Sequence, residues 1–240
     1  MIKGVDIVIP SYNSEGSIEK LIYEIEFYSI NLPLKINKII VVNDCSTDDT
    51  EKILKKISKK NSLLTIINNK TNLGQVKATL KGIEYSNSEY IITLDDDLQH
   101  PPSEIHKLLN KINEKDYDFI IANWDPDETR FRNFTSRVAG FLFNFFSFRG
   151  LNFKHTAFRC INSRIKDKIL IKLKNETFLD LRKISNNYSI VSVKHNSKPY
   201  NRSYMPFKRR FLIAIKYIFK DTYFLVFCTL LVLIALKLIK

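Results

Sequence analysis

Apolar and polar positions alternate with two different periods along the first half of the chain. Five short apolar runs have the length and composition of buried strands, at residues 5–10, 38–43, 63–67, 90–94 and 119–122. Between them, apolar side chains recur at helical spacing, which predicts helices over residues 14–28 and 75–85 and helices that begin near residues 47 and 101. This alternation predicts an α/β fold in which a mostly parallel sheet carries helices on both faces.

Polar loops follow four of the predicted strands. They span residues 10–13, 44–48, 72–75 and 95–97. The carboxyl ends of parallel strands lie at one edge of a sheet, so we expect these loops to converge there and to bind a ligand. The chain has none of the glycine-rich phosphate loops of dinucleotide-binding or NTPase folds. A phosphorylated ligand would therefore need a metal ion and basic side chains to balance its charge.

The last of these loops holds three consecutive acids, Asp95, Asp96 and Asp97, directly after an apolar strand. Carboxylates crowded in this way repel one another, and their hard oxygen ligands suit Mg²⁺ or Mn²⁺ that also holds substrate phosphates. The alternative is a solvated acidic turn, because turns favour aspartate. The triplet alone leaves both interpretations open.

Charge and hydropathy change character toward the C-terminus. The 240-residue chain carries 38 Lys and Arg against 25 Asp and Glu, a net charge of +13. The lysines of residues 51–60 fit a solvated helix face, but those of residues 208–220 directly precede an uncharged apolar run at 223–236. That second cluster indicates a membrane surface and not nucleic acid. We expect an amphipathic juxtamembrane segment at 206–221 and a membrane helix at 222–240, with a buried helix of a soluble protein as the alternative.

The N-terminus and the cysteines bear on the compartment. Residues 1–6 lack the long apolar region of a secretory signal, which predicts that the globular part stays in the cytoplasm. Cys45, Cys160 and Cys228 lie far apart, without the paired spacing of a zinc site or a disulfide framework. We expect them to be ordinary core residues.

Four motifs occur in a fixed order, at residues 8–13, 41–48, 72–74 and 94–102. They read Val-Ile-Pro-Ser-Tyr-Asn, Val-Val-Asn-Asp-Cys-Ser-Thr-Asp, Asn-Leu-Gly and Leu-Asp-Asp-Asp-Leu-Gln-His-Pro-Pro. On these motifs the chain resembles the family-2 glycosyltransferases of the A-type fold, and among them the dolichyl- and undecaprenyl-phosphate sugar transferases. The resemblance implies a catalytic domain at residues 1–205, built on the A-type nucleotide-binding sheet.

The resemblance also implies which residues contact the donor. Pro10, Tyr12 and Asp44 would surround the nucleotide base and ribose, since a tyrosine ring can contact the base and a carboxylate can accept hydrogen bonds from base N–H groups. Further donor contacts implied by the same motifs are Asn13, Ser14, Val42, Asn72, Gly74 and Asp96. Many relatives have Glu at the place of Ser14, so the resemblance implies that this nucleotide contact is either lost or altered here.

The acidic loop would serve as the metal site. By resemblance, Asp95 and Asp97 flank the donor diphosphate and bind Mg²⁺ or Mn²⁺, and Gln99 adds a neutral oxygen ligand. The metal would neutralise the departing nucleotide diphosphate, which makes Asp95 and Asp97 the candidate catalytic carboxylates.

Basic residues in the second half match the same family more weakly. Arg137 resembles the Arg of a Ser-Arg pair, and Arg159 the Arg of a Phe-Arg segment. Lys198 and Arg202 lie in a stretch that resembles a late basic loop, with Lys198 in the place of an Arg. The resemblance implies that these side chains bind donor or acceptor phosphate. For Arg137 and Arg159 an exposed charge on an amphipathic element is the alternative.

The resulting functional prediction is an inverting, metal-dependent glycosyltransferase that moves a sugar from a nucleotide-sugar donor to a polyprenyl phosphate at the cytoplasmic face of the inner membrane. A lipid phosphate is already ionised, so no protein base is required. The alternative acceptor is a hydroxyl of a lipid-linked glycan or lipopolysaccharide, which needs a general base, either Glu176 or Asp180. A non-enzymatic alternative is a membrane-tethered scaffold that binds nucleotide sugars. A homo-oligomer is possible in each case.

Overall fold

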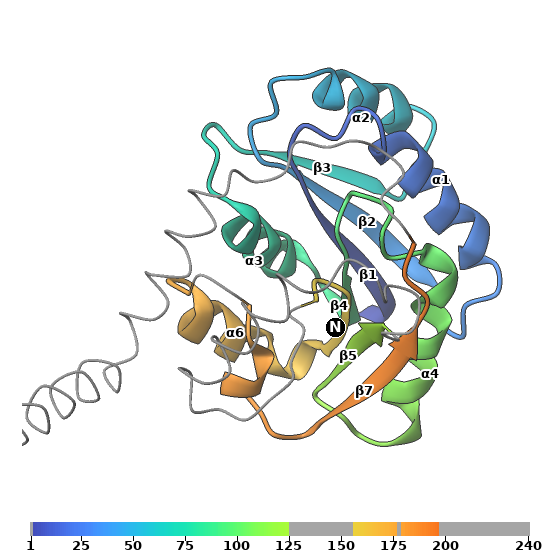
Figure 1. The fold of residues 1–240 in the computed structure, drawn as a ribbon, viewed down its shortest axis with the longest axis vertical. Coiled ribbons are helices and arrows are strands. Elements are labelled where there is room, and N and C mark those ends of the chain that lie inside the picture. The colour runs from blue at the N-terminus through green and yellow to red at the C-terminus, as the bar shows by residue number, and fades with distance from the viewer. Residues whose placement is uncertain (1, 125–155, 177–178, 197–240) are drawn as a thin grey trace, which may run out of the picture. The chain divides into compact units, whose positions relative to one another are not determined.

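The computed structural model describes residues 2–124, 156–176 and 179–196, which form one compact unit (Figure 1). Its strands are β1 (Ile2–Ser11), β2 (Ile36–Asn43), β3 (Leu64–Asn68), β4 (Ser88–Thr93), β5 (Phe119–Trp124), β6 (Arg159–Asn162) and β7 (Tyr188–Val193). Its α-helices are α1 (Ile18–Ser29), α2 (Thr50–Ser58), α3 (Gln75–Tyr85), α4 (Ile105–Glu114) and α6 (Lys166–Leu173). Short 3₁₀ turns are η1 (Pro102–Glu104), η3 (Ser163–Ile165) and η4 (Leu181–Lys183).

The strands form one mixed, mostly parallel sheet in the order β3-β2-β1-β4-β6-β5-β7. Every neighbouring pair is parallel except β4–β6 and β6–β5, in which β6 runs antiparallel. The five strands and four helices that the hydrophobic pattern predicts are confirmed, with ends displaced by a few residues. The pattern did not predict β6, which is short, or β7, whose side chains alternate between partly buried and exposed.

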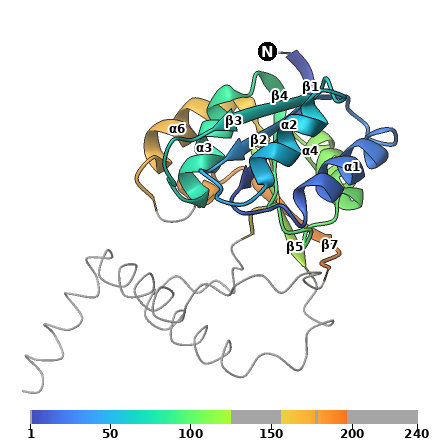
Figure 2. The same cartoon turned by 90° about the horizontal axis from the view of Figure 1, so that it is seen from above.

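Helices cover both faces of the sheet, as expected. In two perpendicular views α1, α2 and α4 lie on one face and α3 and α6 on the other (Figures 1 and 2). Val5, Ile7 and Ile9 of β1 belong to one hydrophobic core cluster, together with the apolar stripe of α1, namely Ile18, Leu21, Ile22 and Ile25. The period-2 pattern of β1 thus meets the helical pattern of α1, and burial of both supplies most of the driving force for this layer.

Close packing of α3 against the other face depends on a glycine. A Cβ at Gly82 would lie 2.3 Å from Cγ1 of Val8 and 3.2 Å from Cγ2 of Val42. No side chain fits at that distance, so the missing Cβ is what lets the helix backbone approach β1 and β2. The start of the same helix lies at the carboxyl end of β2, where the Gly74 N–H donates to Asp44.

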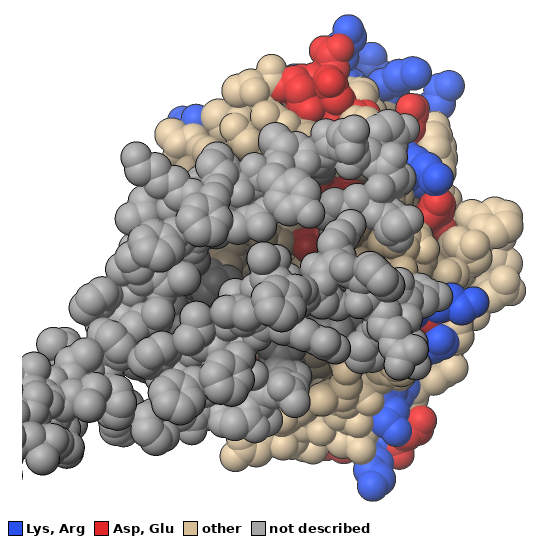
Figure 3. Space-filling view, in the orientation of Figure 1, with Lys and Arg blue, Asp and Glu red and all other residues tan. Residues whose placement is uncertain are grey.

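Charged side chains on α2 form local pairs. Lys55 contacts Glu51 at 2.6 Å and Lys52 contacts Asp49 at 4.0 Å, all of them largely exposed. Acidic and basic side chains lie together in this region of the surface (Figure 3). The lysines of this helix therefore form the solvated, mixed-charge face that the sequence predicted.

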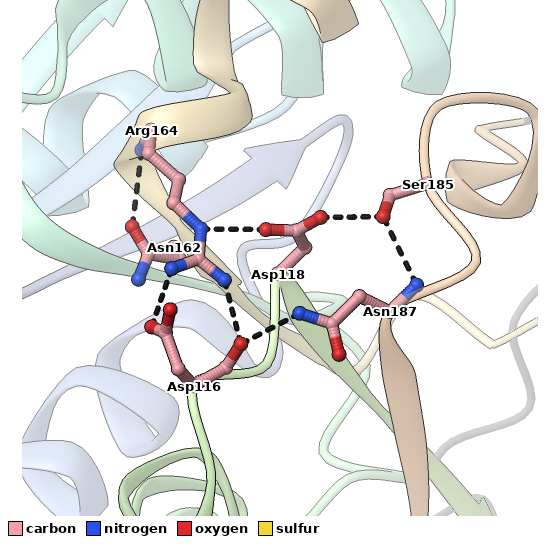
Figure 4. A network of polar contacts seen from close by, with 6 residues as sticks. All are labelled: Asp116, Asp118, Asn162, Arg164, Ser185 and Asn187. Atoms are coloured by element: carbon pink, nitrogen blue, oxygen red, sulfur yellow. Dashed lines mark hydrogen bonds and ion pairs between the residues drawn. The ribbon is translucent and has the colours of Figure 1, made fainter.

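A network of polar contacts joins β5, β6 and β7 at the edge opposite the polar loops. It comprises Asp116, Asp118, Asn162, Arg164, Ser185 and Asn187 (Figure 4). The Arg164 guanidinium contacts the carboxylates of Asp116 and Asp118, and its Nη2 donates to the backbone oxygen of Asp116 at 2.7 Å. Ser185 donates to Asp118. These contacts connect the start of β5 to the end of β6 and the start of β7.

Part of the sequence prediction lies outside the described residues. This holds for the juxtamembrane segment at 206–221 and the membrane helix at 222–240. Within the ranges that the structure describes, no helix is long and apolar enough to cross a membrane.

A buried acid joins β1 to the start of β4. Asp6 is 1% exposed, and its two carboxylate oxygens accept the hydroxyls of Ser86 and Ser88, at 2.7 and 2.8 Å, and the backbone N–H groups of Asn87 and Ser88. We predict that Asp6→Ala, which leaves these donors unsatisfied, lowers the free energy of unfolding by about 3 kcal/mol in urea denaturation. Asp116→Ala removes an 86% exposed carboxylate and should cost less than about 1 kcal/mol. Equal losses would contradict this role of Asp6.

The placement of β6 between two strands protects its cysteine. Cys160 is fully buried, and burial raises the pKa of its thiol, whereas Cys45 is half-buried in the loop after β2. We predict that iodoacetamide at pH 8 alkylates Cys45 at least about 100-fold faster than Cys160 in the folded protein, measured by peptide mass spectrometry. In denaturant the two rates should converge. Rapid labelling of Cys160 in the folded protein would show that β6 does not lie between β4 and β5.

Candidate functional site

Three polar loops meet at the carboxyl edge of the sheet because β2, β1 and β4 are neighbours. Each loop contains a non-glycine residue with positive φ: Asn13 at 53°, Cys45 at 63° and Leu98 at 61°. Among the described residues these are the only such positions outside glycine. Left-handed backbone at non-glycine residues is unfavourable and concentrates at functional sites.

The loops after β1 and β2 are bonded to each other. The Asn13 backbone N–H donates to the Ser46 hydroxyl at 3.0 Å, and the Thr47 N–H donates to Oδ1 of Asn13 at 2.8 Å. Ser14 is fully buried, and its N–H donates to Oγ1 of Thr50 at 2.7 Å. Asn13 and Ser14 are both predicted to contact the nucleotide sugar. In the structure they also fix the shape of the carboxyl edge of the sheet.

Asp44 is buried under the segment that leads into α3. Its Oδ1 accepts from Nδ2 of Asn69 at 2.7 Å and from the N–H of Leu73 at 2.9 Å, and its Oδ2 accepts from the N–H of Gly74 at 2.7 Å. Gly74, with φ of 86°, is the N-cap that directly precedes α3. The side chain of Asn69 is itself held, because its Oδ1 accepts from Nζ of Lys81 at 2.6 Å. One carboxylate therefore bonds both ends of the loop after β3.

The three acids after β4 contact different parts of the site. Oδ2 of Asp96 accepts from the backbone N–H of Tyr12 at 3.2 Å and from the Ser14 hydroxyl. Oδ1 of Asp95 accepts from the Gln75 side chain at the start of α3. Oδ1 of Asp97 accepts from the N–H of Gln99 within its own turn. Asp96 thus joins the first loop to the fourth, and Asp95 joins the third loop to the fourth.

Electrostatic crowding is strongest at Asp95. Burial, followed by the neighbouring charges of Asp97 and Asp96, raises its pKa to about 7, against the opposing effects of Arg159 and of the hydrogen bond from Gln75. Arg159, on β6, is 8% exposed, and burial lowers its pKa to about 10 while Asp95 and Asp180 favour its charged form. Arg159 is therefore a buried cation at neutral pH and not the exposed surface charge that was the alternative.

The side-chain oxygen atoms of the acidic loop are of the kind that binds a divalent cation whose remaining ligands come from phosphate. Asp95, Asp97 and Gln99 offer hard oxygen atoms, and the raised pKa of Asp95 shows that a positive charge would stabilise its ionised form. In the part of the chain that the structure describes, no group of three or more His, Cys, Asp or Glu side chains could alone hold a metal. Mg²⁺ sites commonly use one or two carboxylates and complete their coordination with substrate phosphates.

The acids proposed as general bases are both in ion pairs. Both carboxylate oxygens of Asp180 accept from the Arg182 guanidinium, at 2.8 and 2.9 Å. Glu176 contacts Nζ of Lys183 at 3.1 Å. Proton abstraction by either acid would compete with these contacts.

The remaining predicted site residues fall into three groups. Tyr12 is 47% exposed and Asn72 is exposed, so both can reach a ligand. Pro10 and Val42 are buried in the sheet. Arg137, Lys198 and Arg202 lie outside the described residues. Sequence reasoning missed Asn69, Gln75 and Lys81, because a single Asn, Gln or Lys at the start of a loop or within a helix carries no pattern that marks a partner far along the chain.

The family profile of glycosyl transferase family 2 matches residues 6–171, more than half of the chain. The chain belongs to glycosyl transferase family 2. This family-2 chain is 37% identical over 121 residues to the undecaprenyl-phosphate 4-deoxy-4-formamido-L-arabinose transferase of Pseudomonas syringae, covering 50% of this chain and 35% of that protein. It is also 37% identical over 137 residues to an uncharacterized glycosyltransferase of Synechocystis, covering 56% and 42%. The family-2 chain spans less than half the length of these relatives.

Solved structures share the fold of this family-2 chain. Mannosyl-3-phosphoglycerate synthase from Rubrobacter xylanophilus matches with a TM-score of 0.65 at 15% identity, over 91% of this chain and 73% of that one. Glucosyl-3-phosphoglycerate synthase from Mycobacterium tuberculosis, in complex with Mn²⁺, uridine diphosphate and glucosyl-3-phosphoglycerate, matches with a TM-score of 0.61 at 14% identity, over 88% and 76%. The expected A-type glycosyltransferase fold is thereby confirmed for the catalytic sheet.

The bonds of Asp44 generate a local prediction. Asp44→Ala should release the backbone N–H groups of Leu73 and Gly74, and their amide hydrogen exchange should accelerate at least about tenfold, because bonds to a carboxylate are stronger than neutral ones. The exchange can be followed by NMR or by mass spectrometry of peptides that cover residues 69–76.

Asp48→Ala is the matched control, since Asp48 lies in the same loop but accepts from the N–H groups of Glu15 and Thr50. It should accelerate exchange at those two amides and leave Leu73 and Gly74 unchanged. Acceleration of the same amides in both variants would mean that the loops unfold together and that Asp44 has no separate role.

Proposed function

We propose that this chain is an inverting, metal-dependent glycosyltransferase that moves a sugar from a nucleotide-sugar donor to a polyprenyl phosphate. The observation that carries the proposal is the placement of Asp44 and of the acidic loop at the ends of β2 and β4, on either side of β1. Two strand spacings separate them, roughly 10 Å. That is about the span between the base and the second phosphate of an extended nucleoside diphosphate.

The donor would lie across the ends of these three strands. Oδ2 of Asp44, which accepts from the Gly74 N–H and retains acceptor capacity, would accept an N–H of the base, and the exposed ring of Tyr12 would contact the base or ribose. Asn13, Ser14, Asn72, Gly74 and Asp96 line or shape the same edge. Val42 and Pro10 are buried in the sheet, so their part would be to support the residues that contact the donor.

Asp97, Asp95 and Gln99 would hold Mg²⁺ or Mn²⁺ at the diphosphate. When bound, the metal neutralises the charge that develops on the departing nucleoside diphosphate. The solved structures of M. tuberculosis glucosyl-3-phosphoglycerate synthase with Mn²⁺ and uridine diphosphate support this assignment through the shared fold. Asp95 and Asp97 are in this sense the catalytic carboxylates.

The acceptor assignment rests on the named relatives and on the state of the acids. Relatives at 32–37% identity are named as undecaprenyl-phosphate sugar transferases. A phosphate acceptor is ionised near neutral pH and needs alignment but no general base. This agrees with Asp180, whose carboxylate is already bound by Arg182. Arg159, Arg137, Lys198 and Arg202 would balance the charges of the donor and acceptor phosphates.

A membrane location completes the proposal. The basic segment at 206–221 and the apolar segment at 222–240 would keep the chain at the cytoplasmic face of the inner membrane, within reach of the isoprenoid. The catalytic domain, residues 1–205, would catalyse the sugar transfer, either in a single chain or in a homo-oligomer.

The decisive experiment measures nucleoside diphosphate release by the full chain in membranes. A panel of nucleotide sugars is supplied with Mn²⁺ or Mg²⁺, with and without undecaprenyl phosphate. We predict that one donor gives release that requires both lipid phosphate and metal, and that Asp97→Ala lowers the rate at least about 100-fold, the scale of losing transition-state charge stabilisation. Asp116→Ala, an exposed acid at the opposite edge, should keep the wild-type rate.

Two results would change the proposal. Donor binding without release on adding lipid phosphate, but with release on adding a lipid-linked glycan, would assign a hydroxyl acceptor and direct attention to Asp180 and Glu176 as bases. Metal-dependent donor binding with no release under any condition would favour the non-enzymatic scaffold.

A further inference from the structure

The chain that leaves β7 runs against the acidic loop. The backbone N–H of Asn196 donates to the carbonyl oxygen of Gln99 at 3.0 Å, and its side-chain Nδ2 donates to the carbonyl oxygen of Leu98 at 3.2 Å. One residue thus satisfies two successive carbonyl groups of the loop that carries Asp97. The two segments are far apart in sequence, and these contacts attach the end of β7 to the end of β4.

The turn that Asn196 contacts has an unfavourable backbone conformation. Leu98 has a φ of 61°, in the left-handed region that leucine seldom adopts, and its side chain is 3% exposed. The same turn places the N–H of Gln99 on Oδ1 of Asp97 at 3.2 Å. A strained conformation persists only where its surroundings hold it. The two bonds from Asn196 act directly on the strained residue and on the next one.

Asn196 is in turn held from the side of α4. Glu104 is 5% exposed, and its Oε2 accepts from the backbone N–H of Lys194 at 3.1 Å and from Nζ of Lys107 at 2.6 Å. Between these anchors, the ring of His195 packs edge-to-face on that of His100, with centroids 5.5 Å apart. Asn196 therefore approaches the loop from a segment fixed by a buried carboxylate and by ring packing.

We propose that Asn196 is a positioning residue for the metal site: its two hydrogen bonds hold the turn at Leu98 in the conformation that presents Asp97 and Gln99 to a metal-bound diphosphate. The inference rests on the proposed function, since it assigns Asn196 a role in metal-dependent nucleotide binding. Asn196 acts through the loop and contacts neither the metal nor the donor.

The test compares two asparagines that lie on either side of β7 in the sequence. Asn196→Ala removes the bond to Leu98 and retains the backbone bond to Gln99. Asn187→Ala is the matched control, because Nδ2 of Asn187 also donates to a backbone carbonyl, that of Asp116 at 2.6 Å, at the opposite end of β7. Asn196→Asp is a second variant of nearly unchanged shape that lacks the donor.

The readout is the affinity of the purified full chain for uridine, guanosine, cytidine, thymidine and adenosine diphosphates by calorimetry, with Mn²⁺ and with EDTA. For each diphosphate, the quantity of interest is the affinity measured with Mn²⁺ divided by the affinity measured with EDTA. We expect Asn196→Ala to lower this ratio at least about fivefold, the effect of one hydrogen bond on the loop. Asn196→Asp should lower it too, and Asn187→Ala should keep the wild-type ratio. Melting temperatures should fall by similar amounts in both alanine variants, so a purely structural role would not change the ratio.

The outcomes separate this inference from the proposed function. If the wild-type chain shows metal-stimulated binding and Asn196→Ala shows the same ratio, the positioning role is wrong and the proposed function stands. A fall of the ratio by the same factor in Asn187→Ala would also overturn it, as a general loss of stability. If the wild-type chain binds none of the five diphosphates more tightly with Mn²⁺, the proposed metal-dependent function fails, and the inference fails with it.

Discussion

Mutual repulsion among the three carboxylates after β4 is the constraint on which the surrounding loops depend. Asp96 takes its donors from Tyr12 and Ser14, in the loop after β1, and Asp95 takes one from Gln75 at the start of α3. Two of the three acids thus bind a different loop to the end of β4, while Asp97 accepts from Gln99 within its own turn. The pKa of Asp95 is nevertheless raised to about 7, first by burial and then by its acidic neighbours. The acidic loop therefore concentrates negative charge at the edge where, in the proposed function, a divalent metal ion would bind.

Most of the fold could be predicted from hydrophobic period, for a physical reason. Buried parallel strands are continuous apolar runs, and α1, with buried residues at Ile18, Leu21, Ile22 and Ile25, shows its stripe directly in the sequence. The sequence did not reveal β6, which is four residues long and carries a buried Arg159. That arginine is tolerated in the sheet because two acids lie near it, and this compensation exists only in three dimensions.

The candidate site, like the fold, could be predicted from the sequence only in part. Acids such as Asp44 and Asp97 could be identified because they follow strands in recognisable motifs, and the strand order brings them to one edge. The residues that hydrogen-bond to these acids and to their loops could not be identified from the sequence. Asn69 reaches Asp44, and Asn196 reaches the turn at Leu98, through single hydrogen bonds between residues distant in sequence. Asparagine is common in loops, so its presence there carries no information about a partner.

The central position of β6 has a consequence for how the protein is made. The parallel strands β3, β2, β1 and β4 are complete once residue 93 has emerged, and β5 follows soon after, but β6 is complete only once residue 162 has emerged. Until then the edge of β4 offers a row of unpaired backbone groups in the middle of the future sheet. A nascent or truncated chain that stops short of residue 159 therefore exposes a strand edge to which a neighbouring chain can add. Completion of the sheet, and protection from such aggregation, comes late in synthesis.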